Sequence, residues 1–478
     1  MNLAFQATRL AFPRLAAESV RRAHLIGIAG AGMQALAEVM LGQSWRITGS
    51  DLAPESAPWL SAAGMQVFAR HRAEHVPSNA DLVVYSDAIG AENPERRRAA
   101  ECGIRLLSYP AMLGELMAGR TGLAVAGTHG KSTTTAMAGE ILTEAKRNPT
   151  VIAGAAPLGR NSGGCYGRGP HVLVEACEYR SNFLDLAPQV VVILGIEHDH
   201  FDCFASFAEV EQAFAQFAER VPRGGLILAH AGCPTTMRVA KASARRVVTF
   251  GLGVNAEWRA TGLHSSRGRY SFRVARRGHR LAEVKLEIPG VHNVLNALAA
   301  AALAGELGVE RSAIERGLSR FRGLRRRLET VGSWGEIVLV DEYAHHPTEI
   351  AAGLKTVRER FPGRRLWCIF QPHQASRTKA LLDEFAASLH NADRVAVAEI
   401  YRAREAPGEM SEVTAAQLAE RLSALGRPAM NVYGAEEIVE RVFAELAPGD
   451  VLITMGAGDI RKVSDAFVER LRTYRAAG

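Results

Sequence analysis

Short apolar runs, each followed by a glycine-rich or polar turn and then by a stretch with helical spacing, recur along most of the chain. Some of these runs, such as residues 171–175 and 190–194, are continuously apolar, which is typical of parallel strands buried on both faces. Towards the C-terminus, strand-like runs such as 365–370 alternate with helical stretches such as 347–360. This alternation predicts an α/β fold with mainly parallel sheets.

The predicted elements form three blocks, and the length of the chain agrees with that number. At 478 residues the chain exceeds the size at which a single hydrophobic core stops growing. We expect an N-terminal overhang over residues 1–22, followed by domains over 23–120, 121–330 and 331–478.

The first block begins like a nucleotide-binding domain. A strand-like run at 24–29 leads into a glycine loop, a helical stretch at 33–42 and a second strand at 45–51. Glycines let a backbone approach an anion, and the helix N-terminus offers unpaired N–H groups to it. The loop glycines are Gly27, Gly30 and Gly32. Their spacing, G-x-x-G-x-G, differs from the dinucleotide pattern, so the loop alone does not identify the ligand. Asp51 closes the second strand and can accept hydrogen bonds from a ribose.

The second block contains the clearest motif of the chain. An apolar strand at 121–126 runs directly into GTHGKS and then into a helical stretch. This is the context of a phosphate loop, although Val125 stands where the first glycine of that motif usually lies. Lys131 is placed to neutralise the β and γ phosphates of a nucleotide, and Ser132 to offer its hydroxyl to Mg²⁺.

Magnesium needs more ligands than one hydroxyl, and acidic residues follow two neighbouring strands. Glu175 ends the strand HVLVE, and the next apolar run leads into EHDHFD at 197–202. Mg²⁺ binds oxygen ligands and keeps several waters, so these strand ends predict a metal site beside the phosphate loop. Solvated polar turns remain the alternative for individual residues of the second cluster.

Further polar residues gather near the boundary between the second and third blocks. Asn293 and Asn296 lie three residues apart, on one face of an alanine-rich helix. They either contact a purine edge or are ordinary capping and solvated amides. Arg327 and Asp341 flank the boundary, where a closing domain can add charge to a nucleotide.

Two motifs at strand ends in the third block indicate a substrate site. DEYAHHP at 341–347 combines two acids with two adjacent histidines, and QPHQASR at 371–377 combines a histidine with an arginine. A guanidinium at such a place is suited to a substrate carboxylate.

Composition excludes several classes of protein. Hydrophobic residues make up 47% of the chain and charged residues 22%, and no run reaches the length of about 18 apolar residues that spans a bilayer. The six cysteines form no C-x-x-C pair, which favours reduced thiols and a cytoplasmic location. The net charge of +7 suits small polyanions, and no aromatic residues interleave the basic runs as in a nucleic-acid surface. We therefore expect small-molecule substrates, no nucleic acid and no membrane partner, and leave the oligomeric state open.

Taken together, the motifs resemble the Mur ligase family of peptidoglycan synthesis, whose phosphate loop reads G-T-x-G-K-[ST] without the first glycine. The resemblance runs from GIAGAGM at 27–33 to MGAGDI at 455–460, nearly the whole chain after the overhang. It implies three α/β domains: a Rossmann-like domain, a central P-loop-type ATPase domain and a Rossmann-like C-terminal domain.

The resemblance also implies site residues. Residues of the first domain would hold a UDP-sugar: Gly27, Gly30, Ala31, Gly32, Met33, Asp51, His71 and Ser86. Residues of the phosphate loop would bind the ATP phosphates: Gly127, Thr128, His129, Gly130, Lys131, Ser132 and Thr133. Others would surround adenosine: His292, Asn293, Asn296, Arg327 and Asp341. Three would hold magnesium: Ser132, Glu175 and His200. Three would face the amino acid: Tyr343, His345 and Arg377. Catalysis would rest on Lys131, Ser132, Glu175, His200, His345 and Arg377.

The implied reaction is ATP-dependent ligation of L-alanine to the lactyl carboxylate of UDP-N-acetylmuramate through an acyl phosphate, with Mg²⁺. Cys177 and Gln374 depart from the family pattern, so the preference among alanine, serine and glycine stays open. Three alternatives remain: a ligase that joins a tripeptide to the same sugar, a nucleotide-dependent binding or switch protein, and a nicotinamide dehydrogenase. GIAGAGM disfavours the first, the lack of N-K-x-D the second, and GTHGKS the third.

Overall fold

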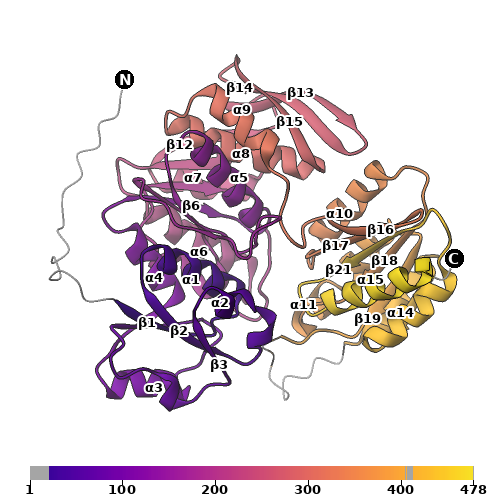
Figure 1. Ribbon diagram of the computed structural model, residues 1–478. Helices are drawn as coiled ribbons and strands as arrows, with labels where there is room; N and C mark the ends of the chain where they lie inside the picture. The colour runs from indigo at the N-terminus through magenta and orange to yellow at the C-terminus, as the bar shows by residue number, and fades with distance from the viewer. Residues whose placement is uncertain (1–20, 404, 406–412, 477–478) are drawn as a thin grey trace.

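The computed structural model describes residues 21–403, 405 and 413–476, which form three α/β domains (Figure 1). The first and central domains lie one against the other on the left of Figure 1, and the third, orange to yellow, lies on the right. The predicted fold class is confirmed. Most of the expected overhang, residues 1–20, lies outside the described residues, and the first strand begins at Arg22.

The first domain is built on a parallel sheet with the strand order β3-β2-β1-β4-β5. The order reverses at β1 and β4, and ligands of such sheets bind at the carboxyl ends of the strands where this reversal occurs. The strands are β1 (Arg22–Ile26), β2 (Arg46–Asp51), β3 (Gln66–Ala69), β4 (Leu82–Tyr85) and β5 (Arg105–Ser108). The helices are α1 (Ala31–Gly42), α2 (Trp59–Ala62), α3 (Pro94–Glu101) and α4 (Tyr109–Met117), with short 3-10 turns η1 (Pro54–Ser56) and η2 (Ala73–His75).

The central domain has a ten-stranded sheet in the order β15-β14-β13-β12-β11-β10-β6-β9-β7-β8. Its parallel part carries the phosphate loop, while β14 pairs antiparallel with β13 and β15 to extend one edge. The strands are β6 (Thr121–Ala126), β7 (Thr150–Ile152), β8 (Gly164–Cys165), β9 (His171–Glu175), β10 (Val190–Ile193), β11 (Leu226–His230), β12 (Arg246–Gly251), β13 (Trp258–Ser266), β14 (Arg269–Arg276) and β15 (His279–Pro289). The helices are α5 (Lys131–Glu144), the 3-10 segment η3 (Tyr179–Asp185), α6 (Phe207–Glu219), α7 (Pro234–Ala242), α8 (Val291–Glu306) and α9 (Arg311–Arg320).

The third domain has a six-stranded sheet in the order β16-β17-β21-β18-β19-β20, parallel except for β16. The strands are β16 (Glu329–Trp334), β17 (Ile337–Glu342), β18 (Leu366–Phe370), β19 (Arg394–Ala398), β20 (Ala429–Val432) and β21 (Val451–Met455). The helices are α10 (Pro347–Arg360), α11 (Ala375–Ala380), α12 (Leu382–Leu389), α13 (Ala415–Ala424), α14 (Gly434–Glu445) and α15 (Arg461–Ala476).

The buried cores explain how the domains are coupled. One hydrophobic cluster contains residues of both the first and the central domain, such as Leu36 and Val174, so these two domains pack as one body. The third domain has clusters of its own on the two faces of its sheet. Its described hydrogen bonds and ion pairs with the central domain come from polar side chains, such as Arg377 with Asp199 at the strand ends and Glu359 of α10 with Tyr270 of β14.

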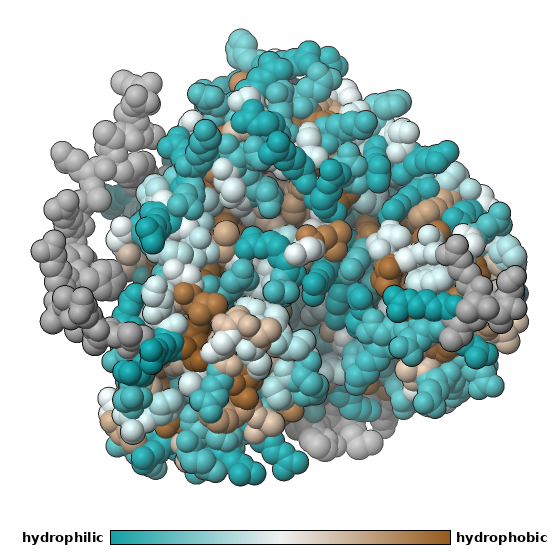
Figure 2. Space-filling model, in the orientation of Figure 1, coloured by the Kyte–Doolittle hydropathy of each residue, from teal (hydrophilic) through white to brown (hydrophobic). Residues whose placement is uncertain are grey.

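The outer surface is largely polar. Hydrophilic residues cover most of the face seen in Figure 2, and hydrophobic residues appear there only in small, separate patches. Among the described helices, none combines the length and the apolar character that crossing a membrane requires.

Candidate active site

The phosphate loop connects β6 to α5, and two glycines determine its shape. Gly127 has φ 133° and Gly130 has φ 81°, a region in which residues with a side chain are strained. A Cβ at Gly127 would lie 2.7 Å from the Cβ of Leu194, and one at Gly130 would overlap the Oδ1 of Asn296. The glycines therefore let the loop pack closely against the end of β10 and against α8.

Lys131, the first residue of α5, is held in the loop by three acceptors. Its Nζ donates to the carbonyl oxygens of Gly127 (2.6 Å) and Thr128 (3.1 Å) and to the Oε1 of Glu178 (2.9 Å). Burial disfavours the ammonium ion, but Glu178 and the neighbouring Glu175 and Cys177 together outweigh burial and raise the pKa of Lys131 above its usual range. A permanent cation thus lies at a helix N-terminus, the combination that a polyphosphate requires.

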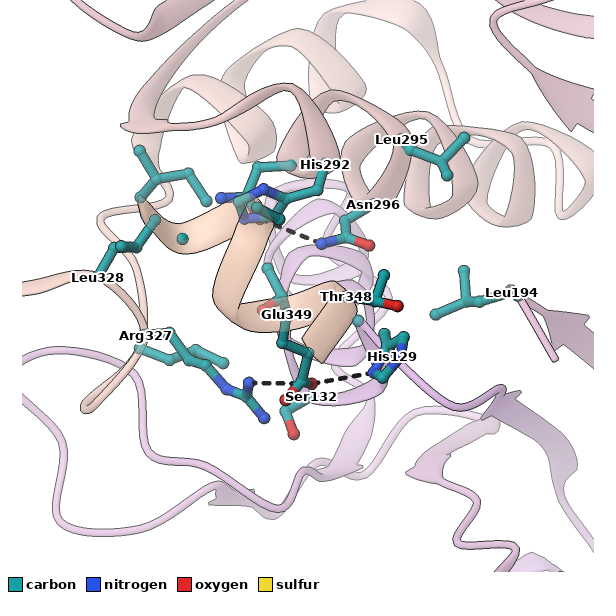
Figure 3. A pocket seen from close by; sticks show the side chains of 18 of the residues that line it. His129, Ser132, Leu194, His292, Leu295, Asn296, Arg327, Leu328, Thr348 and Glu349 are labelled. Atoms are coloured by element: carbon teal, nitrogen blue, oxygen red, sulfur yellow. Dashed lines mark hydrogen bonds and ion pairs between the residues drawn. The ribbon is translucent and has the colours of Figure 1, made fainter. Parts of the chain in front are cut away.

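A cavity of about 250 Å³, here called the helix cavity, lies between the phosphate loop and helices α8 and α10 (Figure 3). Asn293 and Asn296 share one face of α8, as predicted, and the Nδ2 of Asn296 donates to the Oδ1 of Asn293 at 3.1 Å. The cavity is lined by these predicted residues: His129, Gly130, Ser132, Thr133, His292, Asn293, Asn296 and Arg327. Apolar residues complete it: Leu194, Ile288, Leu295, Phe321 and Leu324. An apolar slot with a few amides and an imidazole suits a planar nitrogenous base.

Two titratable groups of the helix cavity are perturbed by burial. Burial lowers the pKa of His292 to about 4, and the charge of Arg327 acts in the same direction. Burial also raises the pKa of Glu342 to about 7, although Arg327 opposes that shift. His292 is therefore a neutral imidazole near neutral pH, able to act as both donor and acceptor.

Asp341, predicted to lie at the nucleotide, is not among the residues that line the helix cavity. Its side chain is fully buried inside the third domain, where it accepts from Thr454 Oγ1 (3.0 Å) and pairs with Arg461 (2.9 Å). The next residue, Glu342, lines the cavity instead. Successive residues of a strand point to opposite faces, so Glu342 faces the cavity and Asp341 faces the interior of the third domain; a contact of Asp341 with a nucleotide stays a prediction.

A second cavity of about 500 Å³, here called the strand-end cavity, lies where β9, β10, β17 and β18 end. It brings together residues that the sequence predicted for metal, phosphate and amino acid: Thr128, Gly130, Lys131, Ser132, Glu175, His200, Tyr343, His345 and Arg377. The two cavities share four lining residues: Gly130, Ser132, Arg327 and Glu349. A ligand in the helix cavity can therefore extend past the phosphate loop into the strand-end cavity.

His345 presents a neutral imidazole to the strand-end cavity. Burial lowers its pKa to about 4, against the opposing charge of Glu349. Its Nδ1 lies 3.1 Å from the carbonyl oxygen of Tyr343, so Nδ1 carries the proton and donates it in this contact. The Nε2 lone pair is then free to accept a proton from a ligand.

Arg377 is more deeply engaged than the sequence indicated. Its side chain is 1% exposed, and its Nε and one terminal nitrogen donate to Asp199 Oδ1 at 2.8 and 2.6 Å. The other terminal nitrogen donates to the carbonyl oxygen of His373 at 3.0 Å. Asp199, which the sequence grouped with the metal cluster, thus ties the central domain to the third domain.

Acidic residues that the sequence analysis missed connect the phosphate loop to α10. Glu349 accepts from His129 Nδ1 at 3.1 Å and lies 3.7 Å from Arg327, so the three side chains form the row seen in Figure 3. Burial lowers the pKa of His129, but the neighbouring carboxylates of Glu349 and Glu197 together outweigh it and raise that pKa to about 9. Glu349 lies in the first turn of α10, and only its contact with a loop distant in sequence marks it as a site residue.

The glycine loop of the first domain follows β1. Gly27 has φ 80°, and a Cβ there would lie 3.0 Å from the Cβ of Ser86, which follows β4. The Oδ2 of Asp51 accepts from the N–H of Ala29 at 2.9 Å, so Asp51 also shapes the loop. The predicted residues Gly30, Ala31 and Gly32 form the N-cap and first turn of α1.

The side chains of two other predicted residues of the first domain, Met33 and His71, contact residues within that domain. Met33 is 2% exposed and belongs to the hydrophobic core, so its side chain cannot contact a sugar. The Nδ1 of His71 lies 2.8 Å from Ser50 Oγ, at the carboxyl end of β2.

A Cβ at Gly32 would lie 2.8 Å from the hydroxyl of Tyr109. Burial and the charge of Glu175 raise the pKa of Tyr109 above its usual range. Tyr109 therefore connects the glycine loop of the first domain to Glu175 of the strand-end cavity.

The chain is thus defined as a three-domain phosphate-loop protein in which a helix-lined cavity and a polar cavity meet at Gly130 and Ser132 of the loop and at Arg327 and Glu349. Family models match each domain: "Mur ligase family, catalytic domain" at 22–121, "Mur ligase middle domain" at 125–304 and "Mur ligase, glutamate ligase domain" at 326–458. The chain belongs to the Mur ligase family, which confirms the resemblance noted in the sequence.

Individual relatives agree along nearly the whole chain. The UDP-N-acetylmuramate--L-alanine ligase of Salinibacter ruber is 42% identical over 455 residues, 95% of either chain. The enzyme of the same name from Clostridium novyi is 38% identical over 94% of this chain and 97% of its own. Among solved structures, the UDP-N-acetylmuramate-alanine ligase MurC of Thermotoga maritima superposes with a TM-score of 0.80 at 29% identity, covering 95% of this chain and 99% of its own.

Proposed function

We propose that this chain is an ATP-dependent ligase that joins L-alanine to the lactyl carboxylate of UDP-N-acetylmuramate, in the cytoplasm. The observation that carries the proposal is the meeting of the two cavities at Gly130, Ser132, Arg327 and Glu349. It allows adenosine in the helix cavity, with the γ-phosphate directed into the strand-end cavity. The relatives named for this activity, at 37–42% identity over most of the chain, favour it over the tripeptide ligase and the switch protein.

The first step would activate the sugar acid. A carboxylate resists attack by an amine because of its negative charge, and phosphorylation removes that charge. One oxygen of the lactyl carboxylate attacks the γ-phosphorus of ATP and ADP leaves, so an acyl phosphate forms. Lys131 and the N-terminus of α5 offset the repulsion between the two anions.

The second step would form the amide. The neutral amine of alanine attacks the acyl carbon, and inorganic phosphate leaves from the tetrahedral intermediate with one of the original carboxylate oxygens. His345, with its Nε2 lone pair free, accepts the proton that the amine loses. Asp199 and His373 take four of the five N–H groups of Arg377, and the remaining one, on the terminal nitrogen that faces Asp199, can orient the carboxylate of the amino acid.

Magnesium fits the residues that line the strand-end cavity. Ser132 supplies a hydroxyl and Glu175 a carboxylate, the oxygen donors that Mg²⁺ prefers, and His200 lines the same cavity. Glu175 Oε2 accepts from the N–H of Gly154 at 2.6 Å, which orients the carboxylate and leaves its other oxygen for a metal. Bound there, Mg²⁺ would lower the negative charge of the phosphates and hold them in line with the attacking oxygen.

The proposal is tested by phosphate release from ATP with UDP-N-acetylmuramate and a panel of alanine, serine, glycine and an alanine-containing tripeptide. We expect release to depend on the UDP-sugar and to be fastest with alanine, with a product heavier by one alanyl residue. Release with the tripeptide alone would instead establish the tripeptide ligase.

A further inference from the structure

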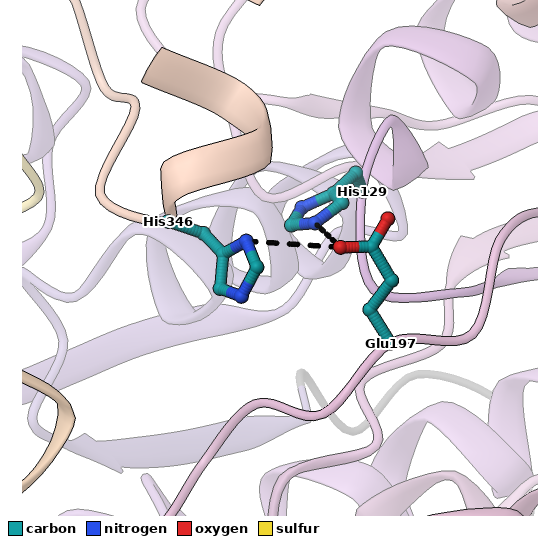
Figure 4. Close-up of side chains that lie close together, drawn as sticks. All are labelled: His129, Glu197 and His346. Carbon is teal, nitrogen blue, oxygen red and sulfur yellow. Dashed lines mark ion pairs between the residues drawn. The ribbon is translucent and has the colours of Figure 1, made fainter. Parts of the chain in front are cut away.

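Three metal-ligating side chains from two domains face one another beside the phosphate loop (Figure 4). His129 lies in that loop, Glu197 follows β10, and His346 is the N-cap of α10 in the third domain. Glu197 Oε2 lies 3.5 Å from His129 Nε2 and 3.8 Å from His346 Nδ1. One ligand atom from each of the three residues lies within 4.8 Å of the other two. None of them belongs to the predicted magnesium set of Ser132, Glu175 and His200.

We propose that His129, Glu197 and His346 bind a zinc-type divalent cation that joins the central domain to the third domain. The site shares His129 and Glu197 with the lining of the helix cavity, but it differs from the predicted magnesium set and does not depend on which substrates the ligase uses. It rests on an orphaned nitrogen atom, the geometry of the three ligand atoms and the chemistry of the donor set.

The orphaned nitrogen belongs to His129. Its Nε2 is buried and makes no hydrogen bond, although it faces Glu197 Oε2. The other ring nitrogen, Nδ1, lies 3.1 Å from Glu349 Oε1. A carboxylate that accepts from one ring nitrogen fixes the tautomer and leaves the other nitrogen as a metal ligand, which is how most metal-bound histidines are held.

The carboxylate ligand is oriented in the same way. Thr348 Oγ1 donates to Glu197 Oε2 at 2.7 Å, so the oxygen that faces both histidines is held from the side of α10. His346 Nδ1 also accepts from the N–H of Thr348, but that cap is long, at 3.4 Å. A metal bond would replace a weak hydrogen bond there.

The spacing of the ligand atoms suits zinc. Bonds of about 2.0–2.1 Å in a tetrahedron place the ligand atoms about 3.3 Å apart. The two measured separations, 3.5 and 3.8 Å, need a contraction of only a few tenths of an ångström. Two imidazoles and one carboxylate form a common zinc donor set with an open fourth position, whereas Mg²⁺ prefers oxygen atoms alone.

The ligands come from two domains, so the cation would connect these domains. His129 and Glu197 belong to the central domain and His346 to the third domain, so the bound cation would fix these two domains in the arrangement seen here. Without the cation, a proton can bind to Nε2 of His129, and the charged ring then pairs with Glu197 and Glu349. Because metal and proton compete for Nε2, zinc affinity should fall as the pH is lowered.

The test is a titration of the metal-stripped full chain with Zn²⁺ against a chromophoric chelator, without nucleotide. We expect one tight equivalent in the unaltered chain, not displaced by millimolar Mg²⁺. Glu197→Gln and His346→Gln should each weaken binding by about 100-fold. His279→Gln, at an exposed histidine of the β14–β15 turn, is the matched control and should bind as the unaltered chain does.

Two further readouts keep the result independent of misfolding. Melting curves without metal should be similar for all four proteins, because Glu197 is 40% exposed and the other replacements keep a polar side chain. Added Zn²⁺ should raise the melting temperature of the unaltered and His279→Gln chains but not that of Glu197→Gln. Zinc binding that survives in both site variants, or no tight equivalent in the unaltered chain, overturns the proposal.

Discussion

Lys131 places a fixed positive charge in the strand-end cavity. The loop carbonyls and Glu178 hold its ammonium group there, next to Gly130 and Ser132, which line both cavities. Its raised pKa keeps it charged at neutral pH and well above. No other residue of the loop carries a permanent positive charge.

We therefore predict that Lys131→Ala lowers the rate of ADP formation by about 100-fold or more, since it removes one preorganised cation from the phosphates. Lys241→Ala, at an exposed lysine of α7, is the control and should leave the rate unchanged. A Lys131→Ala chain that melts normally and turns over at the unaltered rate would contradict the assignment.

His345 makes a separate prediction about stability and pH. Its pKa is lowered from 6.5 to about 4, so the unfolded chain binds this proton more tightly than the folded one. The stabilising contribution is present above pH 6.5 and is lost as the pH falls towards 4, by at most about 3 kcal/mol. His345→Gln should therefore flatten the fall in unfolding free energy between pH 6.5 and 4, measured by urea denaturation. Parallel curves for the variant and the unaltered chain would show that burial does not perturb His345.

At the scale of elements, local patterns predicted most of the strands and helices that carry the site. The stretch 347–360 was predicted as helical and is α10, because a proline at its first position and arginines in its last turn mark both ends. The antiparallel strands β13–β15 were not predicted, although alternating residues and the Arg-Gly turns at 267–268 and 277–278 contain the signal.

Contacts between distant elements could not be predicted. Whether Asp341 or Glu342 faces the helix cavity depends on how β17 sits between β16 and β21, which the sequence of β17 does not contain. Likewise, Asp199 and Arg377 meet across 178 residues of chain, and neither motif indicates the other. The candidate residues were therefore predictable as groups at strand ends, but their individual partners were not.

The turn between β6 and α5 gives a prediction at this scale. Gly130→Ala should weaken ATP binding by at least about 10-fold, because the new Cβ overlaps Asn296 and moves the loop or α8. Gly159→Ala is the control for backbone strain. Gly159 has a similar φ of 84°, but a Cβ there would meet no other atom, so this variant has the strain without the clash. It should cost about 1 kcal/mol of stability and keep the ATP affinity. Calorimetric titration with a non-hydrolysable ATP analogue measures the affinity of each variant. Equal affinities for the two variants would refute the clash.

For the whole molecule, the Asp199–Arg377 ion pair connects a third domain that otherwise has its own cores. Asp199→Asn leaves a buried guanidinium without a carboxylate. This should destabilise the arrangement in which the central and third domains are in contact by about 3–5 kcal/mol. We predict a larger radius of gyration by small-angle scattering with substrates present, and a lower kcat. Asp383→Asn breaks an exposed ion pair within the third domain and should change neither quantity. Identical scattering for both variants would show that the pair does not hold the domains closed.

The central claim is that ATP activates the sugar acid as an acyl phosphate, and isotope transfer tests it most directly. UDP-N-acetylmuramate labelled with ¹⁸O in its lactyl carboxylate is incubated with the protein, ATP, Mg²⁺ and L-alanine, and the released phosphate is analysed by mass spectrometry. The account predicts one ¹⁸O atom in each phosphate and an alanyl amide in the sugar product. Phosphate without the label, or labelled phosphate without the amide, would contradict it.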